Sequence, residues 1–154
     1  MKLKLLLIFF PLVLLTACSW RIRFFIVNSG NGPANIEIKL NSNNHGFPIF
    51  HYRNLYVHEA PDDKIKDAER EIVPDTLENY AHFKFILAPH TAVEIGELQN
   101  DHYERYSQHF INDRVFNLES LSVTSAGKET KIVPETFDSY FKKGKYGELY
   151  YFNR

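Results

Sequence analysis

Cysteine is almost absent from this chain of 154 residues: Cys18 is its one cysteine, and tryptophan and methionine also occur once each. A domain that begins after Cys18 contains no free thiol and no disulfide, so it can fold in an oxidising compartment without mispairing. Charge of one sign is not in excess, with 18 basic against 19 acidic side chains and no basic run, so nothing points to nucleic acid as a partner. The composition, 44% hydrophobic and 15% aromatic, excludes a collagen-like, disordered or multi-pass membrane protein.

The first residues have the pattern of an export signal. Lys2 and Lys4 form a short positive region, and residues 5–15 form an apolar run of 11 residues interrupted only by Pro11. A membrane-spanning helix needs about 20 residues, whereas this length is typical of the hydrophobic region of a signal peptide. We therefore expect residues 1–17 to be a signal peptide, removed from a single globular domain of residues 18–154.

The end of that run, Leu15-Thr16-Ala17-Cys18, resembles the lipobox of bacterial lipoproteins. The resemblance implies a diacylglyceryl group on the Cys18 sulfur, cleavage between Ala17 and Cys18, and acylation of the new amino terminus. Two or three acyl chains anchor a protein stably, whereas one gives only marginal binding. The alternative interpretation is an ordinary secretory signal followed by a chance cysteine.

The residues after Cys18 indicate to which membrane the lipoprotein is sent. In lipoproteins of Gram-negative bacteria, an acidic residue just after the cysteine usually retains the protein in the inner membrane. Ser19 and Trp20 stand there instead, which resembles the default route to the outer membrane. For a Gram-negative source we expect a protein anchored to the outer membrane and facing the periplasm.

The rest of the chain is dominated by strand patterns. Apolar and polar residues alternate in residues 21–27 and 34–40 on either side of the Gly- and Asn-rich residues 28–33, which predicts an antiparallel hairpin. A second hairpin is predicted from residues 118–125 and 129–133. Further strands are predicted at residues 47–57, 81–87, 91–98 and 149–152.

Two segments have helical patterns instead. Asp101 and Glu104 are spaced as in a capping box, and Tyr103, Tyr106 and Phe110 share one helical face, which predicts a helix over residues 101–110. Residues 134–143 begin with proline and are followed by Gly144, which predicts a second helix.

Strands separated by frequent turns predict a mainly β fold, an antiparallel two-sheet sandwich with one or two short helices. The stretch 27–38, and residues 85–90 leading into Val93 and Ile95, resemble parts of bacterial immunoglobulin-like modules. The resemblance covers about half of the chain after Cys18, and the helical patterns leave an α+β arrangement as the alternative.

Residues 59–79 are polar and charged, and we expect them to form a long surface excursion. Long loops in compact domains are often functional. Ile65, Ala68 and Ile72 form a thin apolar stripe in helical phase. We therefore predict that these three residues bind a protein partner.

Patterns that would indicate catalysis or metal binding are weak. His102 and His109 are too far apart for the i, i+4 pairing that chelates one ion, and Pro61 prevents His58 and Glu59 from belonging to a helical zinc motif. The chain has no Gly-x-Ser-x-Gly elbow, and Asp62, Asp63, Asp67, Glu69 and Glu71 have the mixed-sign surroundings of a solvated face.

We therefore expect no metal site, no cofactor and no catalytic residue. The expected protein is a lipid-anchored cell-envelope protein that acts as a binding or structural module, accessory to an envelope complex. The alternatives are an anchored periplasmic hydrolase and a periplasmic metal-binding protein.

Lipidation of Cys18 can be tested by replacing this residue. Cys18→Ala removes the sulfur that would carry the diacylglyceryl group, so we expect the variant to lose labelling by a palmitate analogue and to leave the membrane fraction. Labelling of wild-type and variant cells, followed by membrane fractionation, measures this. A variant that remains fully labelled and membrane-bound would show that Cys18 is not the anchor.

Overall fold

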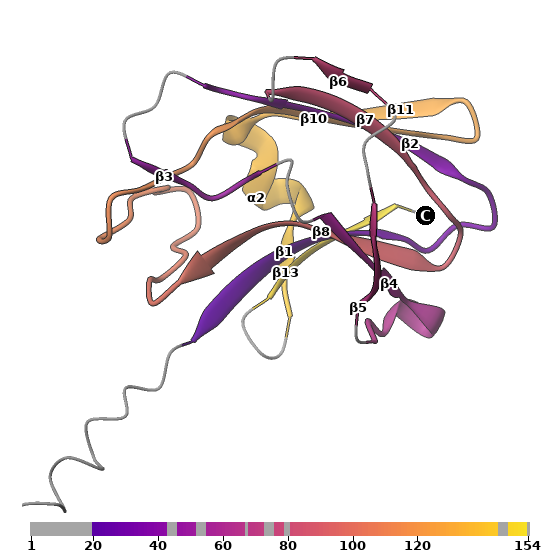
Figure 1. The fold of residues 1–154 in the computed structure, drawn as a ribbon, viewed down its shortest axis with the longest axis horizontal. Coiled ribbons are helices and arrows are strands. Elements are labelled where there is room, and N and C mark those ends of the chain that lie inside the picture. Colours follow the sequence, from indigo (N-terminus) through magenta and orange to yellow (C-terminus); the bar gives the residue numbers. More distant parts are fainter. Residues whose placement is uncertain are drawn as a thin grey trace, which may run out of the picture.

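The computed structural model describes residues 20–42, 46–51, 55–66, 68–72, 76–78, 81–144 and 148–153. Within these residues the chain forms two main sheets packed face to face, as Figure 1 shows. The prediction of a mainly β, two-sheet sandwich is therefore confirmed.

The strands follow one another along the chain from Arg21 to Asn153. Their bounds are β1 (Arg21–Asn28), β2 (Ala34–Leu40), β3 (Phe47–Pro48), β4 (Leu55–Glu59), β5 (Ala68–Ile72), β6 (Thr76–Glu78), β7 (His82–Leu87), β8 (Thr91–Gln99), β9 (Arg114–Val115), β10 (Leu118–Ser125), β11 (Lys128–Ile132), β12 (Lys142–Lys143) and β13 (Leu149–Asn153). Among the described residues, one sheet has the order β12-β13-β1-β8-β4-β5 and the other has the order β11-β10-β2-β7-β6. A small third sheet pairs β3 with β9.

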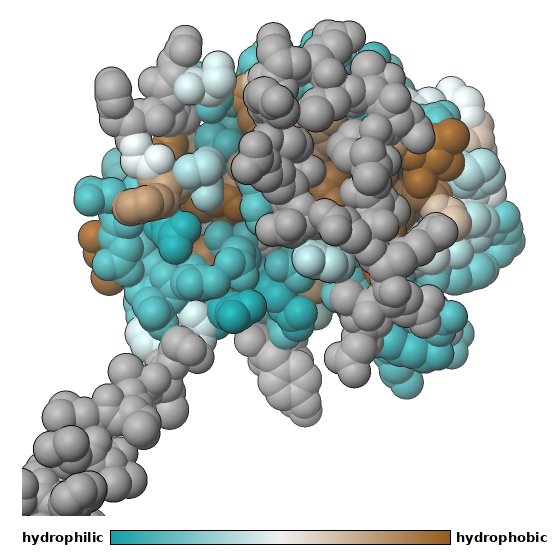
Figure 2. Space-filling model, in the orientation of Figure 1, coloured by the Kyte–Doolittle hydropathy of each residue, from teal (hydrophilic) through white to brown (hydrophobic). Residues whose placement is uncertain are grey.

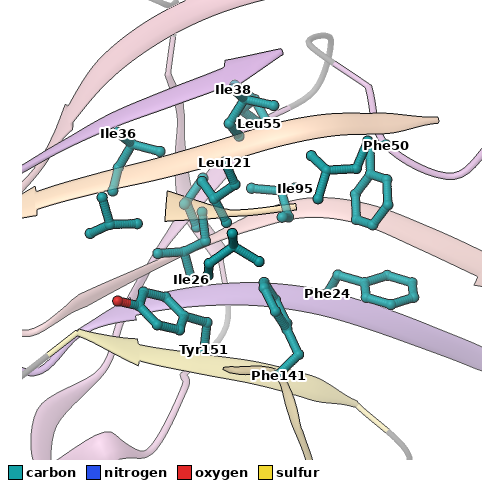
Figure 3. Close-up of a cluster of buried hydrophobic side chains, with 14 of the residues drawn as sticks. Phe24, Ile26, Ile36, Ile38, Phe50, Leu55, Ile95, Leu121, Phe141 and Tyr151 are labelled. Carbon is teal, nitrogen blue, oxygen red and sulfur yellow. The ribbon is translucent and has the colours of Figure 1, made fainter. Parts of the chain in front are cut away.

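The core lies between the two main sheets. Ile36 and Ile38 on β2 are buried, whereas Glu37 between them is partly exposed, as expected for a strand with one face on the core. Figure 3 shows side chains from both sheets pointing toward one another across this core, among them Ile26 on β1 and Leu121 on β10. Burial of apolar surface, at roughly 25 cal/mol per Å², holds the two sheets together.

The predicted hairpin of residues 21–27 and 34–40 is wrong. β1 pairs with β8, and β2 pairs with β7, so β1 and β2 belong to opposite sheets. The connection after Asn28 crosses the sandwich instead of turning back within one sheet. The physical reason is that β1 is buried on both faces, with Phe24 and Phe25 both fully buried, so it occupies the middle of a sheet.

The hairpin predicted from residues 118–133 is confirmed. β10 and β11 pair in antiparallel register up to Ser125 and Lys128. Ala126 and Gly127 between them both have positive φ, at 49° and 76°, as a two-residue type I′ turn requires. The predicted strand at the C-terminal end is also confirmed as β13, which pairs with β1 in parallel register.

The two predicted helices have different outcomes. The prediction of a helix over residues 101–110 is wrong, because this segment contains a turn at residues 105–107 and otherwise has no regular secondary structure. Residues 134–143 contain a 3₁₀ turn, η2 (Pro134–Thr136), and a single turn of α-helix, α2 (Phe137–Tyr140), which ends where Phe141 becomes extended. In Figure 1, α2 lies between the two sheets at the end of the sandwich where β1 begins.

Packing explains why α2 is so short. Phe137 and Phe141 are both buried, with their rings stacked 4.0 Å apart, and the Phe137 ring contacts Phe24 on β1 and Phe50. The chain then continues directly into β12 at the sheet edge. No helix within the described ranges is long and apolar enough to span a membrane.

The expected surface excursion over residues 59–79 is largely wrong. It contains a 3₁₀ turn, η1 (Pro61–Asp63), followed by β5 at the edge of one sheet and β6 at the edge of the other. β5 pairs with β4 and β6 pairs with β7, both in antiparallel register, so backbone pairing at the sheet edges makes these residues strands in spite of their polar composition. Residues 67, 73–75 and 79 of the predicted excursion lie outside the described residues.

Gly96 on β8 marks a close approach of two backbone segments. Phe50 and Gly96 form an isolated antiparallel β-bridge. A Cβ on Gly96 would lie 2.4 Å from the carbonyl oxygen of Ile49. We expect Gly96→Ala to lower the free energy of unfolding by roughly 1–3 kcal/mol, because the backbone must shift to admit the methyl group. Chemical denaturation followed by circular dichroism measures the change.

Gly32 provides the matched control, because a Cβ there meets no atom within 4 Å. Gly32→Ala should leave the unfolding midpoint nearly unchanged. Equal stabilities of the two variants would contradict the close approach of the segments at Gly96.

Candidate functional site

The candidate site lies at the end of the sandwich where β1 begins and β8 ends. The loop of residues 100–113 contacts two other parts of the chain there: Trp20 donates a hydrogen bond to Asp101 near its beginning, and Phe47 on β3 donates one to Asp113 at its end. We call the side chains of Trp20, Phe47, Tyr106 and Ile111 the entry surface.

The carboxylate of Asp101 joins the beginning of the 100–113 loop to its end. Asp101 is 1% exposed, and its Oδ2 accepts hydrogen bonds from the backbone N–H groups of Ile111 and Asn112 at 2.9 and 3.2 Å. The Asn112 amide in turn donates to the carbonyl oxygen of Asn100 at 2.8 Å. Hydrogen bonds to a charged group contribute about 1.5–3 kcal/mol, so this carboxylate closes the loop firmly.

The carboxylate of Asp138 on α2 holds the middle of the same loop. It accepts a hydrogen bond from the Tyr103 hydroxyl at 2.8 Å and another from the Tyr106 N–H at 2.6 Å. Arg105 adds a hydrogen bond to the Asp138 carbonyl at 2.6 Å. Burial raises the pKa of the Tyr103 hydroxyl, and its hydrogen bond to Asp138 raises that pKa further, so Tyr103 remains a neutral donor.

The loop has an inner and an outer side. Tyr103 and Phe110 pack against the core, whereas Tyr106 is 67% exposed and Ile111 is 79% exposed. Asp101 and Asp138 fix the backbone of these exposed residues directly, since each accepts a hydrogen bond from one of their N–H groups. The loop therefore presents two large side chains to solvent on a fixed frame.

The backbone of this loop is strained. Asn100, Tyr106, Gln108 and Asp113 all have positive φ, between 50° and 64°. Asparagine and aspartate adopt this region more readily than other residues with side chains, whereas a bulky residue such as Tyr106 is an outlier there, so the strain lies mainly at Tyr106 and Gln108. Backbone strain of this kind clusters at functional sites, where the surrounding structure holds it in place.

Trp20 lies against the loop from the side of β1. Its indole N–H donates to the Asp101 carbonyl at 3.1 Å, and its ring stacks on His102 with centroids 5.4 Å apart. The Asn100 N–H donates to the Trp20 carbonyl at 3.0 Å. Trp20 is nevertheless 47% exposed, so one part of the ring is held and the other faces solvent.

A groove of about 640 Å³ adjoins the loop at β3 and β9. Phe47 is 62% exposed beside it, with the Arg114 guanidinium 5.6 Å from the centre of its ring. Gly46 has a φ of 129°, and a Cβ there would lie 2.6 Å from the Asp113 carbonyl oxygen. Figure 2 shows hydrophobic side chains at this end of the molecule among hydrophilic ones.

A second groove, of about 470 Å³, lies on the outer face of the five-stranded sheet. Two of the charged side chains that line it, Glu37 and Lys84, pair with each other, and Glu37 also contacts the neighbouring His82 and Lys39. Partial burial raises the pKa of Glu37, but hydrogen bonds from His82 and Lys84 outweigh it and lower the pKa overall. Because these charges satisfy each other, the entry surface is the stronger candidate site.

The residues predicted to carry function are placed as follows. Cys18 and Ala17 lie outside the described residues. Ile65 is not exposed on a stripe: it packs against the buried side chains of Phe25, Val27, Ala60 and Ala92. Ala68 and Ile72 are at the two ends of β5. A role for Ile65, Ala68 and Ile72 in partner binding stays a prediction.

The histidines and carboxylates singled out in the sequence are dispersed. His58 is buried near Lys66, His102 stacks on Trp20, and Asp62 and Asp63 are in η1. Asp67 lies outside the described residues. Among the residues that the structure describes, no three His, Cys, Asp or Glu side chains come close enough to hold a metal ion.

Sequence reasoning missed the roles of Asp101 and Asp138. The spacing of Asp101 and Glu104 indicated a helix cap, but the Asp101 carboxylate binds N–H groups ten and eleven residues away. Nothing local to Asp138 marks it as the partner of Tyr103 and Tyr106, because these residues are more than thirty positions apart.

Comparisons with protein-family models, with curated proteins and with solved structures find no match to this chain.

The role of Asp101 can be tested by amide hydrogen exchange. Asp101→Asn replaces one acceptor oxygen with an NH₂ group, so we expect faster exchange at Ile111 and Asn112 and a loss of about 2 kcal/mol of stability. Exchange measured by NMR on both proteins reports this residue by residue. Glu104→Gln, a change at an exposed position of the same loop, is the control, and equal exchange in both variants would rule out the assigned role.

Proposed function

We propose that this protein is a lipid-anchored cell-envelope protein, held through Cys18 in the outer membrane facing the periplasm, and that it acts by binding through the entry surface. The leader with its Leu15-Thr16-Ala17-Cys18 sequence supports the anchor. The geometry of the 100–113 loop supports binding.

The observation that carries the proposal is the fixed exposure of Tyr106 and Ile111. Both are more than two-thirds solvent-exposed, while buried carboxylates hold their backbone N–H groups. Burying a large apolar side chain contributes roughly 1.5–3 kcal/mol. A partner that covers both side chains gains this energy without ordering the loop, because the loop is already ordered.

The polar groups around the entry surface have structural partners. Asp101 and Asp138 accept hydrogen bonds from the loop, and Arg105 donates to a backbone carbonyl. These groups build the frame that presents Tyr106 and Ile111. This arrangement favours a contact surface over the anchored hydrolase or the metal-binding protein that the sequence left as alternatives.

Site-specific photocrosslinking in intact cells tests the proposal. We expect p-benzoylphenylalanine at position 111 to form an adduct in high yield, because Ile111 would lie against a bound partner. Position 86 is the matched control: Ile86 is also an isoleucine, is 60% exposed, and is on the outer face of the five-stranded sheet. The measurement is the adduct yield by mass spectrometry, counting protein and lipid adducts alike.

Similar low yields at positions 111 and 86 would contradict binding through the entry surface. A high yield at position 86 alone would move the binding surface to the outer face of the five-stranded sheet.

A further inference from the structure

The distance between the proposed anchor and the domain is very short. Trp20 is two residues beyond Cys18, and an extended chain spans about 3.5 Å per residue, so the Trp20 backbone lies within about 7 Å of the lipidated residue. The headgroup layer on each side of a bilayer is roughly 5–7 Å thick. An anchored Cys18 therefore places Trp20 in this layer or at its surface.

The side chains nearest to Trp20 must then also approach the membrane. Trp20 contacts Asp101 and His102, and Asp101 binds the N–H of Ile111. Asp101 therefore links Ile111 to Trp20, and the exposed side chain of Ile111 approaches the membrane together with Trp20. Tyr106 belongs to the same closed loop, held between Asp101 and Asp138.

The chemistry of the entry surface suits the boundary between water and lipid. Tryptophan and tyrosine are enriched at that boundary, because each has an apolar ring and a polar group. The indole N–H of Trp20 is already paired with a carbonyl oxygen, so the exposed part of its ring can be buried without leaving that donor unpaired. Ile111 and Phe47 add apolar area.

Net charge does not determine whether the entry surface can contact the bilayer. At the start of β1, Arg21 and Arg23 are within 3.8 Å of the acidic Glu97, Glu94 and Glu148, and in the sequence Arg105 and Arg114 each follow an acidic residue, Glu104 and Asp113. Arg21 and Glu97 are within 3.6 Å of each other. Attachment through this surface therefore needs apolar and aromatic contact but no anionic lipid.

We propose that the entry surface docks into the headgroup layer of the bilayer that carries the anchor, so that the sandwich stands end-on with its opposite end facing away. This inference rests on the proposed function, since it takes Cys18 to be the lipidated residue. β1, with eight residues, spans about 26 Å at 3.3 Å per residue, so the opposite end of the sandwich projects by at least that distance.

Fluorescent labels on the lipidated protein in vesicles test this orientation. Cys18 is the one cysteine of the chain, and the lipid would occupy its sulfur, so an introduced cysteine is the only free thiol. We would prepare the mature lipidated protein, beginning at Cys18, with Ile111→Cys, Tyr106→Cys and, as the control, Ile86→Cys. Each would be labelled with nitrobenzoxadiazole and reconstituted into phosphatidylcholine vesicles.

We expect the labels at positions 111 and 106 to emit at shorter wavelength and to be quenched several-fold more than the label at position 86 by lipids carrying a shallow nitroxide. Quenching at positions 111 and 106 no greater than at 86, in protein that floats with the vesicles, would overturn the docking and leave the anchor intact. A blue shift without quenching would also overturn it, because protein and not lipid would then cover the surface.

Vesicle flotation separates this failure from failure of the anchor. Wild-type protein that carries no lipid and does not float would overturn both the anchor and the docking that depends on it. A photocrosslink from position 111 to a protein instead of a lipid would support binding through the entry surface and overturn the membrane as its partner.

Discussion

The side chain of Asn28 holds together the parts of the chain on which the sandwich depends. Asn28 is fully buried, and its amide donates to the carbonyl oxygens of Gly32 and Leu87 at 2.9 and 3.0 Å. Its own oxygen accepts a hydrogen bond from Asn153 at 3.2 Å. The first carbonyl belongs to the connection from β1 to β2, the second to the end of β7, and Asn153 ends β13. One amide therefore fixes two of the crossings between the sheets, from β1 to β2 and from β7 to β8, together with the end of the final strand.

The two ends of the sandwich are built by different means. At the end near Asn28, neutral amides satisfy the buried backbone groups of short turns. At the other end, buried carboxylates close a longer, strained loop around a paired set of phenylalanine rings. An unsatisfied buried polar group costs about 1–3 kcal/mol, so these hydrogen bonds stabilise both ends. The longer loop also exposes the large side chains of Tyr106 and Ile111.

Local patterns in the sequence predicted the long strands well, but they missed β5 and β6, predicted one strand where the structure has β3 and β4, and predicted strand pairing less well. Alternation in β2 and β10 reports which face of a strand is buried, and Gly127 marks the turn that follows β10. Alternation does not report the neighbouring strand, so the crossing at Asn28 could not be distinguished from a hairpin. To predict the pairing of β1, one would have needed to know that both of its faces are buried.

The candidate site was less predictable because its determinants are far apart in the sequence. Tyr103, Tyr106 and Phe110 have helical spacing, but the Tyr106 N–H is bound by Asp138, which comes from another element. That hydrogen bond accompanies a positive φ at Tyr106, which no helix contains. By contrast, the anchor prediction depends only on neighbouring residues and could be made from the sequence alone.

The parallel pairing of β1 with β13 has a mechanical consequence. The start of β1 and the end of β13 lie at opposite ends of two neighbouring strands, which are in register from Phe24 and Leu149 to Asn28 and Asn153. A force applied between a membrane anchor before β1 and the end of β13 acts along both strands. It therefore loads the hydrogen bonds between the two strands in shear, and it loads all of them at the same time. A hairpin pulled at its open end would instead separate one pair at a time. The rate of forced unfolding depends on the barrier that this shared load must overcome, so the domain would transmit tension away from the membrane before it unfolds.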